Sequence, residues 1–224
     1  YIMLAQRLGL SINSSRPLGK WSPDDETSLE AWYQNEVGIT LNGSDVSQWD
    51  DSSTNSHDMI QGTAAEQPAY SGGVLTFDGT DDNLASTQIS LAGEFTVGIS
   101  GDFTGVNNRT IIGDDDAVTE FIKLKSTSIL TVRVAPGNVD FTLSSGTFGD
   151  GYLVITRDGS DNINAYYNGV SISAAQNRPN TVKIDNIGYS RSAGYYTGTI
   201  REVQIYSSTS ADLTSNVNSR LSSL

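Results

Sequence analysis

The acidic turn in the stretch VLTFDGTDDNLA is the first feature that could do chemistry. It places Asp78, Asp81 and Asp82 within five residues, between two apolar runs. Calcium in proteins takes six to eight oxygen ligands, many of them from carboxylates and carbonyls. Asp81, Asp82 and Asn83 are therefore candidate calcium ligands. The alternative, which we favour, is an ordinary turn in which Asp78 accepts backbone amides beyond Gly79, so that no cofactor is required.

A second acidic run and the single histidine are weaker candidates. Asp114, Asp115 and Asp116 follow one another, and neither acidic run has the spacing of an EF-hand loop. We expect this second run to be a solvated loop. His57 lies in a loop rich in serine and aspartate. Because the chain has no cysteine with which to complete a zinc site, we expect a surface histidine.

Three tyrosines and an arginine in the stretch GYSRSAGYY could bind a sugar. They are Tyr189, Arg191, Tyr195 and Tyr196. An aromatic ring offers a flat apolar face, and the hydroxyl and guanidinium groups beside it can hydrogen-bond a polar ligand. Tyrosines at strand ends also commonly pack the edge of a sandwich, so both interpretations are open at this point.

The elements that must position these groups are short strands. Runs rich in valine, isoleucine and aromatic residues recur about every 8–12 residues, separated by Gly, Asn, Asp and Ser, which is typical of an all-β antiparallel sandwich. In FTVGISGDF, alternation predicts that Phe95 and Phe103 face the core. In TIREVQIY it places Ile200 with Glu202 on one face, opposite Val203. We expect the following large residues to be buried: Trp32, Trp49, Phe77, Phe95, Phe103, Ile155 and Ile205.

Two local signals near the C-terminus predict a hairpin and a helix. Asn168-Gly169 supplies the positive φ angles of a type I′ turn, so the flanking segments INAYY and VSIS should pair. In SADLTSNVNSRLSSL, Ser210 or Asp212 can cap a short helix. Leu213, Val217 and Leu221 recur at four-residue spacing and should pack against the sandwich.

The composition limits the class of partner. The net charge is −13 and the sequence pI is about 4.2, which is a poor match for nucleic acid or an anionic membrane. No run of about 18 apolar residues is present. We therefore expect neither nucleic acid nor a membrane as a partner.

Residues 1–23 form a distinct opening arm, and residues 24–224 form the sandwich domain. The arm carries an apolar set flanked by basic residues, and its docking candidates are Leu4, Arg7, Leu8, Leu10 and Arg16. Exposed apolar side chains would forgo favourable burial. We therefore expect the arm to dock on a neighbouring subunit or on a second copy of the chain. The alternative is that it folds back on its own domain.

The sequence resembles concanavalin A-like, laminin-G-like jelly-roll domains. The resemblance rests on the order of Trp32-Tyr33, Trp49, the loop 50–58, and Phe77-Asp78-Gly79 with Asp81-Asp82, followed by the closing hairpin, last strand and terminal helix. It covers about 30–224. It implies an antiparallel jelly-roll β-sandwich with a short C-terminal helix. Domains with this opening pattern are frequent in tailed-phage virion proteins and bacterial surface proteins, and the fold does not fix a function.

Laminarinase-type members of this family carry the motif E-x-D-x-x-E on one strand, which places two carboxylates for retaining hydrolysis. No glutamate here begins such a motif, and the sequence has neither a G-x-S-x-G elbow nor a P-loop. We therefore expect that the chain is not an enzyme.

Two functions fit these expectations. The first is a structural protein of a virus particle, such as a phage capsid decoration, head-fibre or tail component, located in the virion and held to other subunits through the arm. The alternative is a carbohydrate-binding lectin module of an extracellular or cell-surface protein, with or without calcium, whose partner would be a cell-surface glycan.

Overall fold

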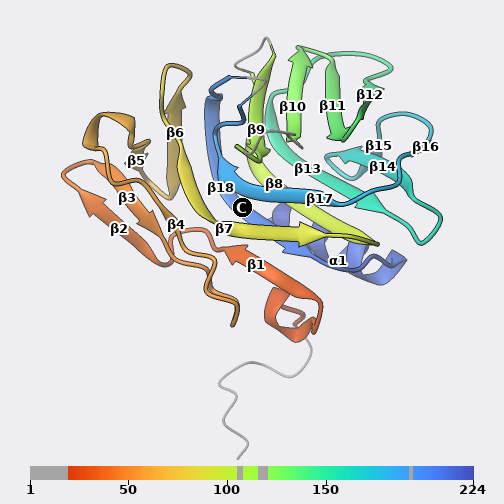
Figure 1. Cartoon of the computed structure of the whole chain (residues 1–224), viewed down its shortest axis with the longest axis horizontal. Coiled ribbons are helices and arrows are strands. Elements are labelled where there is room, and N and C mark those ends of the chain that lie inside the picture. Colours follow the sequence, from red (N-terminus) through yellow and green to blue (C-terminus); the bar gives the residue numbers. More distant parts are fainter. Residues whose placement is uncertain (1–19, 105–107, 116–120, 192–193) are drawn as a thin grey trace, which may run out of the picture.

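The computed structural model describes residues 20–104, 108–115, 121–191 and 194–224 (Figure 1). Eighteen strands in these segments form one hydrogen-bonded network, and the strands pair antiparallel throughout it. The described residues also contain one α-helix, near the C-terminus. None of the described helices is long and apolar enough to cross a membrane.

The first layer is centred on the long strand β18 (Thr197–Tyr206). One side of β18 pairs with β8, which is followed by β13 and β14; the other side pairs with β1 near its C-terminal end and with β6 near its start. The short strands β15 and β16 pair with β14. The bounds are β1 (Leu29–Tyr33), β6 (Val74–Asp78), β8 (Phe95–Asp102), β13 (Asp150–Arg157), β14 (Asn162–Tyr167), β15 (Val170–Ser171) and β16 (Gln176–Asn177).

The second layer runs in the order β12, β11, β10, β9, β17, β7, β4, β3 and β2. A short strand, β5 (Ala69–Ser71), pairs with both β3 and β6 and so joins the two layers. The bounds are β2 (Ile39–Asn42), β3 (Asp45–Trp49), β4 (Met59–Ile60), β7 (Leu84–Leu91), β9 (Arg109–Gly113), β10 (Phe121–Ser126), β11 (Ile129–Val134), β12 (Gly137–Thr142) and β17 (Val182–Ile187). The predicted antiparallel β-sandwich is confirmed.

The core lies between these layers. The predicted core residues Phe77, Phe95 and Phe103 are 1% exposed or less, and Trp49, Ile155 and Ile205 are fully buried. Trp32 is also buried, but on the outer face of the first layer, outside the main core cluster. The alternation predicted for β8 is confirmed, because Phe95, Val97 and Ile99 all belong to the main cluster.

The prediction for β18 is wrong at one position. The register against β8 shifts between Ile200 and Glu202, so Arg201 is an extra residue and the faces exchange there. Ile200 therefore faces the core together with Val203, instead of sharing a face with Glu202. The bulge places the carboxylate of Glu202 on the outer face, where the C-terminal helix covers it.

That helix, α1 (Ala211–Leu221), packs on the outer face of the first layer against β8 and β13. Ser210 caps it by accepting the amide of Leu213 at 3.0 Å, and the stripe Leu213, Val217 and Leu221 is buried as predicted. A Cβ at Gly98 would lie 2.6 Å from Val217 Cγ1, so glycine there lets the helix approach β8 closely.

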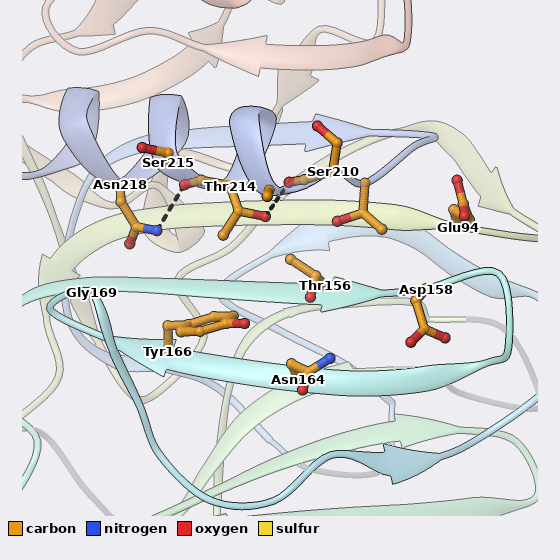
Figure 2. Close-up of a pocket in the computed structure, with 12 residues that line it drawn as sticks. Glu94, Thr156, Asp158, Asn164, Tyr166, Gly169, Ser210, Thr214, Ser215 and Asn218 are labelled. Atoms are coloured by element: carbon orange, nitrogen blue, oxygen red, sulfur yellow. Dashed lines mark hydrogen bonds between the residues drawn. The ribbon is translucent and has the colours of Figure 1, made fainter.

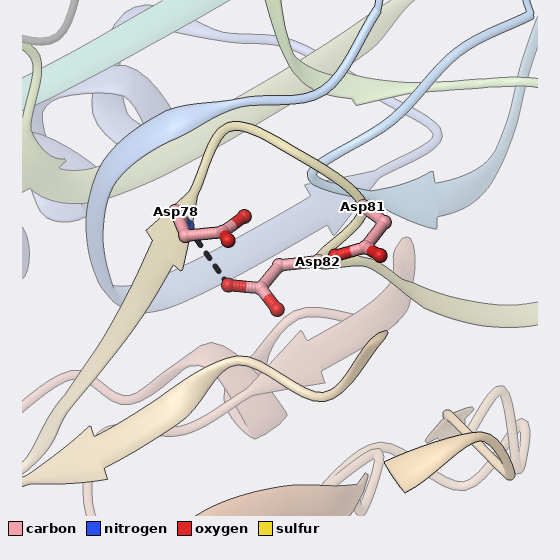
Figure 3. A group of neighbouring side chains, drawn as sticks. All are labelled: Asp78, Asp81 and Asp82. Atoms are coloured by element: carbon pink, nitrogen blue, oxygen red, sulfur yellow. Dashed lines mark hydrogen bonds between the residues drawn. The ribbon is translucent and has the colours of Figure 1, made fainter. Parts of the chain in front are cut away.

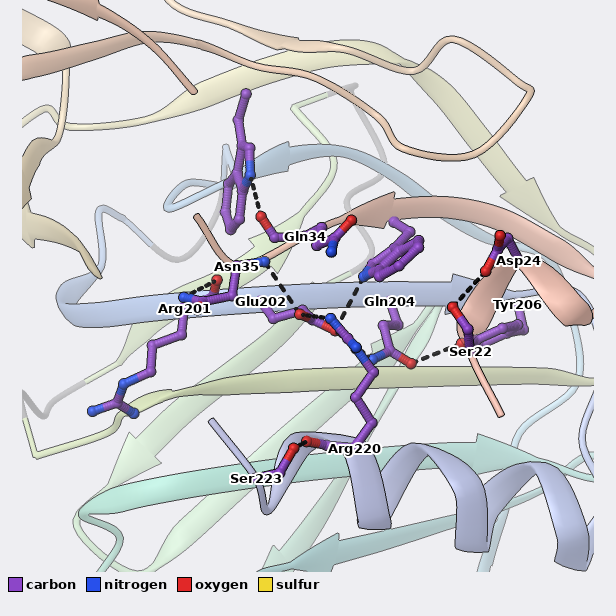
Figure 4. A network of polar contacts seen from close by, with 12 residues as sticks. Ser22, Asp24, Gln34, Asn35, Arg201, Glu202, Gln204, Tyr206, Arg220 and Ser223 are labelled. Carbon is purple, nitrogen blue, oxygen red and sulfur yellow. Dashed lines mark hydrogen bonds and ion pairs between the residues drawn. The ribbon is translucent and has the colours of Figure 1, made fainter. Parts of the chain in front are cut away.

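A polar network fixes the C-terminal turn of α1 to the sheet (Figure 4). Arg220 donates to both carboxylate oxygens of Glu202, and Trp32 Nε1 and Gln204 Nε2 also donate to that carboxylate, at 3.0 and 2.7 Å. Tyr206 donates to Gln204 at 2.7 Å. Because Glu202 is fully buried, these donors replace the water that its charge would otherwise require.

The predicted hairpin is also confirmed. Asn168 and Gly169 have φ angles of 49° and 76°, as a type I′ turn requires, and Tyr167 pairs with Val170 across it.

Candidate functional site

A stacked tyrosine pair lies at the rim of the sandwich where β17 and β18 are joined. The rings of Tyr189 and Tyr195 have centroids 4.6 Å apart and planes inclined by 27°, and both residues are partly exposed. The segment is held to β9 because Thr110 N donates to Gly194 O at 3.4 Å and the hydroxyls of Thr110 and Ser190 are 3.0 Å apart. The two tyrosines therefore form a partly exposed aromatic surface, and hydrogen bonds to β9 hold their loop in place.

Two other predicted ligand residues behave differently. Tyr196 is fully buried, donates to Asp102 O at 2.8 Å and packs against Phe77. The prediction that it contacts a ligand is wrong, because its neighbour in the sequence points outward while Tyr196 points into the sandwich. Arg191 is exposed, as a ligand contact would require, and that role stays a prediction.

The acidic turn between β6 and β7 is built mainly by its own hydrogen bonds. Asp78 accepts the Thr80 amide at 2.7 Å, which confirms the predicted turn beyond Gly79, and Asp82 accepts the Asp78 amide at 2.8 Å (Figure 3). Asn83 donates to Asp81 O at 2.9 Å. A Cβ at Gly79, where φ is 81°, would lie 1.8 Å from the Thr197 hydroxyl, so glycine is required.

This turn nevertheless has the raw material of a cation site. Oxygens of Asp78, Asp81 and Asp82 lie within 4.8 Å of one another. Burial raises the pKa of Asp82 to about 6; the two neighbouring carboxylates add to the rise, and the Asp78 amide opposes it. A divalent cation would relieve that repulsion, so these three residues fit calcium in charge and donor type. Asn83, also predicted as a ligand, uses only its side-chain Nδ2 in the bond to the turn backbone, and its role as a ligand stays a prediction.

The fold brings these two candidate groups together, although more than 100 residues separate them in the sequence. Strand β18 pairs with β6, so Thr197 lies opposite Asp78, directly after the tyrosines. Burial raises the pKa of the Tyr195 hydroxyl, and Tyr189, Glu66 and Asp81 raise it further. The carboxylates of Glu66 and Asp81 therefore lie near this hydroxyl. We call the surface formed by Tyr189, Tyr195 and the turn Asp78–Asp82 the rim site.

A second acidic group lies where β9 meets β17. Oxygens of Asp114, Asp115 and Asp185 lie within 4.8 Å of one another. The expectation of a solvated loop is wrong for Asp114, which is fully buried, while Asp115 is exposed. Asp116 lies outside the described residues. Asp185 could not be selected from the sequence, because only the pairing of β17 with β9 brings it to this position.

This group predicts a pH-dependent stability. Burial and the neighbouring Asp114 raise the pKa of Asp185 to about 7, so the folded state holds its proton more tightly than the unfolded state does. The stability gained from protonating Asp185 in the folded state is complete below the ordinary pKa of 3.8, and it is lost as the pH rises through about 7. We expect Asp185→Asn to raise the melting temperature at about pH 8 and to have little effect at about pH 4. Equal shifts at both pH values in thermal melts would contradict this assignment.

The predicted docking residues Leu4, Arg7, Leu8, Leu10 and Arg16 lie outside the described residues. The described end of the arm contacts its own domain. Trp21 donates to Glu26 at 2.8 Å and packs against the cluster under α1, which consists of Val154, Tyr206, Leu213, Val217 and Leu221. The division at residue 23 and the docking role of the arm stay predictions.

Comparison with known proteins shows the fold alone. No family model and no curated protein matches the sequence. Among solved structures, a sialidase of Trypanosoma rangeli in complex with a difluoro-KDN is similar at 13% identity and a TM-score of 0.60, over 88% of this chain and 33% of that one. The botulinum neurotoxin type G receptor-binding domain is similar at 15% and 0.57, over 87% and 51%.

A structure of botulinum neurotoxin type C, a toxin whose cell entry depends on interaction with two ganglioside molecules, is similar at 14% identity and a TM-score of 0.57. The match covers 86% of this chain and 51% of that one. The chain thus spans between a third and about half of these proteins. The likeness shows a β-sandwich of the kind found in them. Membership in the concanavalin A-like family stays a prediction.

The prediction that the chain is not an enzyme is contradicted by these comparisons, because sialidases are among the matched structures. The prediction rested on a missing pair of carboxylates. Sialidases are an exception to the two-carboxylate scheme, since their nucleophile is a tyrosine. The missing motif was therefore an insufficient reason to exclude catalysis.

Proposed function

We propose that the chain is a glycan-binding module of an extracellular or cell-surface protein, and that the rim site contacts the sugar. The observation that carries this proposal is the stacked pair Tyr189–Tyr195 beside the Asp78–Asp82 turn. The apolar face of a sugar ring can pack on a partly exposed tyrosine, while carboxylates and hydroxyls accept and donate hydrogen bonds to its hydroxyl groups.

The solved structures support this proposal over the virion interpretation. Two of those named above concern a sialidase in complex with a difluoro-KDN and the ganglioside-dependent cell entry of a neurotoxin, and none of the three is a virion protein. The idea of a capsid, head-fibre or tail component therefore gains no support from them. Docking of the arm on other subunits gains none either.

Calcium is a separate part of the proposal. Asp78, Asp81 and Asp82 are the residues that would hold it, and it would supply a fixed positive charge next to the tyrosines. The turn already closes through its own hydrogen bonds. We therefore propose that the module binds its glycan without requiring calcium.

The test is a binding screen of the whole chain against a glycan array, followed by calorimetry with the best ligand. We expect Tyr189→Ala and Tyr195→Ala each to weaken binding by about tenfold, which corresponds to about 1.4 kcal/mol. Val37→Ala is the control, because Val37 is 44% exposed and lies in another loop. An array without a ligand, or tyrosine variants that bind as well as the control, would refute the glycan-binding proposal.

The same titration with a chelator tests the calcium part. We expect the affinity to change little when EDTA is added. A loss of binding with EDTA that is reproduced by Asp81→Asn combined with Asp82→Asn would show instead that a cation in the acidic turn is required.

A further inference from the structure

A long polar groove lies between α1 and the hairpin of β13 and β14, on the outer face of the first layer (Figure 2). It has a volume of about 730 Å³, within the range of small-molecule sites. Along the first layer β13 and β14, which line the groove, are three and four strand spacings, roughly 14 and 19 Å, from β6, the strand that leads into the acidic turn. The groove is therefore distinct from the rim site.

The floor and the walls come from residues far apart in the sequence. Thr156 lies opposite Asn164 in the pairing of β13 with β14, and Tyr166 is two residues further along β14 on the same face. Ser215 and Asn218 of α1 form the other wall. The ring of Tyr166 is partly buried against the cluster under α1, so it is held in place by packing.

Several polar groups in the groove have no partner within the described part of the chain. The amide of Asn164 and the hydroxyls of Tyr166 and Ser215 make no side-chain hydrogen bond there. Asn218 donates to Thr214 O at 2.7 Å, but its Oδ1 is buried and accepts nothing. A Cβ at Gly169 would lie 3.9 Å from that oxygen, so it faces the hairpin turn across the groove. A buried acceptor of this kind is costly unless a ligand or water donates to it.

The charge of the groove defines the ligand further. The lining contains no lysine or arginine, whereas Glu94 and Asp158 lie at one end. The backbone amide and the side chain of Asn162 donate to Asp158, as does the Ser160 amide, and they lower the pKa of that carboxyl, so it is ionised at neutral pH. Anionic ligands such as sialylated or sulfated sugars are therefore repelled. The remaining lining is rich in hydroxyl and amide groups, which suit a ligand that carries many hydroxyls.

From these observations we infer that the groove between α1 and the β13–β14 hairpin is a second binding site, which takes an uncharged oligosaccharide. Tyr166 supplies an apolar face for one sugar ring, and its hydroxyl hydrogen-bonds the sugar. Asn164, Asn218 and Thr156 hydrogen-bond the other sugar hydroxyls. The inference goes beyond the proposed function, because the rim site uses none of these residues, and it makes the chain bivalent for glycans.

The test uses the whole chain and a panel of neutral oligosaccharides, namely malto-, cello-, laminari- and chito-oligosaccharides of about six units, with a sialylated oligosaccharide for comparison. Calorimetry should show binding of at least one neutral oligosaccharide. Asn164→Ala and Tyr166→Phe should each weaken it roughly five- to tenfold, since each removes a hydrogen-bonding group. Ser215→Trp should abolish binding by filling the groove. Ser219→Trp is the matched control, because Ser219 is exposed on the same helix outside the groove.

The outcomes separate this inference from the proposed function. If Tyr189→Ala and Tyr195→Ala remove binding of the neutral oligosaccharide while Ser215→Trp leaves it intact, the ligand sits at the rim site and the groove inference is wrong. If no member of the neutral panel binds, the groove inference is also wrong, whatever glycan the rim site takes. Tyr166→Phe retains the ring and therefore its packing under α1. If this variant melts at the normal temperature, a loss of binding cannot be attributed to unfolding.

Discussion

Replacing Arg220 with alanine is expected to lower the free energy of unfolding by about 3 kcal/mol, the lower end of the loss when one partner of a buried ion pair is removed. Arg220 Nη2 donates to Glu202 Oε2 at 2.7 Å, and the guanidinium carbon lies 4.8 Å from the centre of the Trp32 ring. The variant retains a fully buried carboxylate with its neutral donors but without its cation. The same change removes the anchor of the last turn of α1.

Urea and thermal unfolding would measure the effect, which for a chain of this size corresponds to a fall in melting temperature of roughly 6–12 °C. The control is Lys125→Ala, because the pair Lys125–Asp140 is exposed and should contribute less than about 1 kcal/mol. Combining Arg220→Met with Glu202→Gln removes both charges and should recover most of the loss. An Arg220→Ala variant that melts like the Lys125→Ala variant would contradict the account.

Local patterns made much of the fold predictable. The period of two in FTVGISGDF identifies which residues of β8 face the core, because the strand is regular. The hairpin and the helix were likewise predictable from residues that are close in the sequence, namely Asn168-Gly169 for the hairpin and the spacing of Leu213, Val217 and Leu221 for the helix. These predictions needed no knowledge of which strands meet.

Features that depend on pairing were not predictable in the same way. The bulge at Arg201 reverses the faces of β18, and nothing in TIREVQIY marks it. Buried charges were missed for the same reason. Arg157 is fully buried, and its partners are backbone carbonyls of Leu91, Gly93 and Asn180, which no side-chain motif could reveal.

The candidate sites follow the same division. Tyr189 and Tyr195 could be selected because they share one short loop, but the sequence could not show that the acidic turn lies beside them. Tyr196 was selected wrongly, since adjacency does not tell which of two tyrosines points inward. The groove gave no sequence signal at all. Thr156, Asn164 and Asn218 are ordinary polar residues until α1 docks beside the hairpin.

Phe95 is the residue at which the core and a buried charge meet. Its side chain is 1% exposed, and the Arg157 guanidinium carbon lies 5.0 Å from the centre of its ring. Phe95 also lines a small apolar pocket of about 10 Å³, which is at the lower limit for one water and offers almost no polar partner to hold it. Truncation would therefore enlarge a dry cavity and remove the aromatic face beneath a buried cation.

We expect Phe95→Ala to cost about 3–5 kcal/mol, the usual range for removing a buried phenylalanine. Phe95→Leu keeps most of the volume and should cost less than about 1.5 kcal/mol beyond the loss of the aromatic face. Combining each variant with Arg157→Met isolates the ring–cation contribution, which we expect to be about 1–2 kcal/mol because the pair is desolvated. The burial of Arg157 lowers its pKa, so burial disfavours the charged form. The contact with the Phe95 ring offsets part of that cost. If Phe95→Ala costs no more than Phe95→Leu in urea unfolding, the ring does not fill the space between the layers as β8 places it.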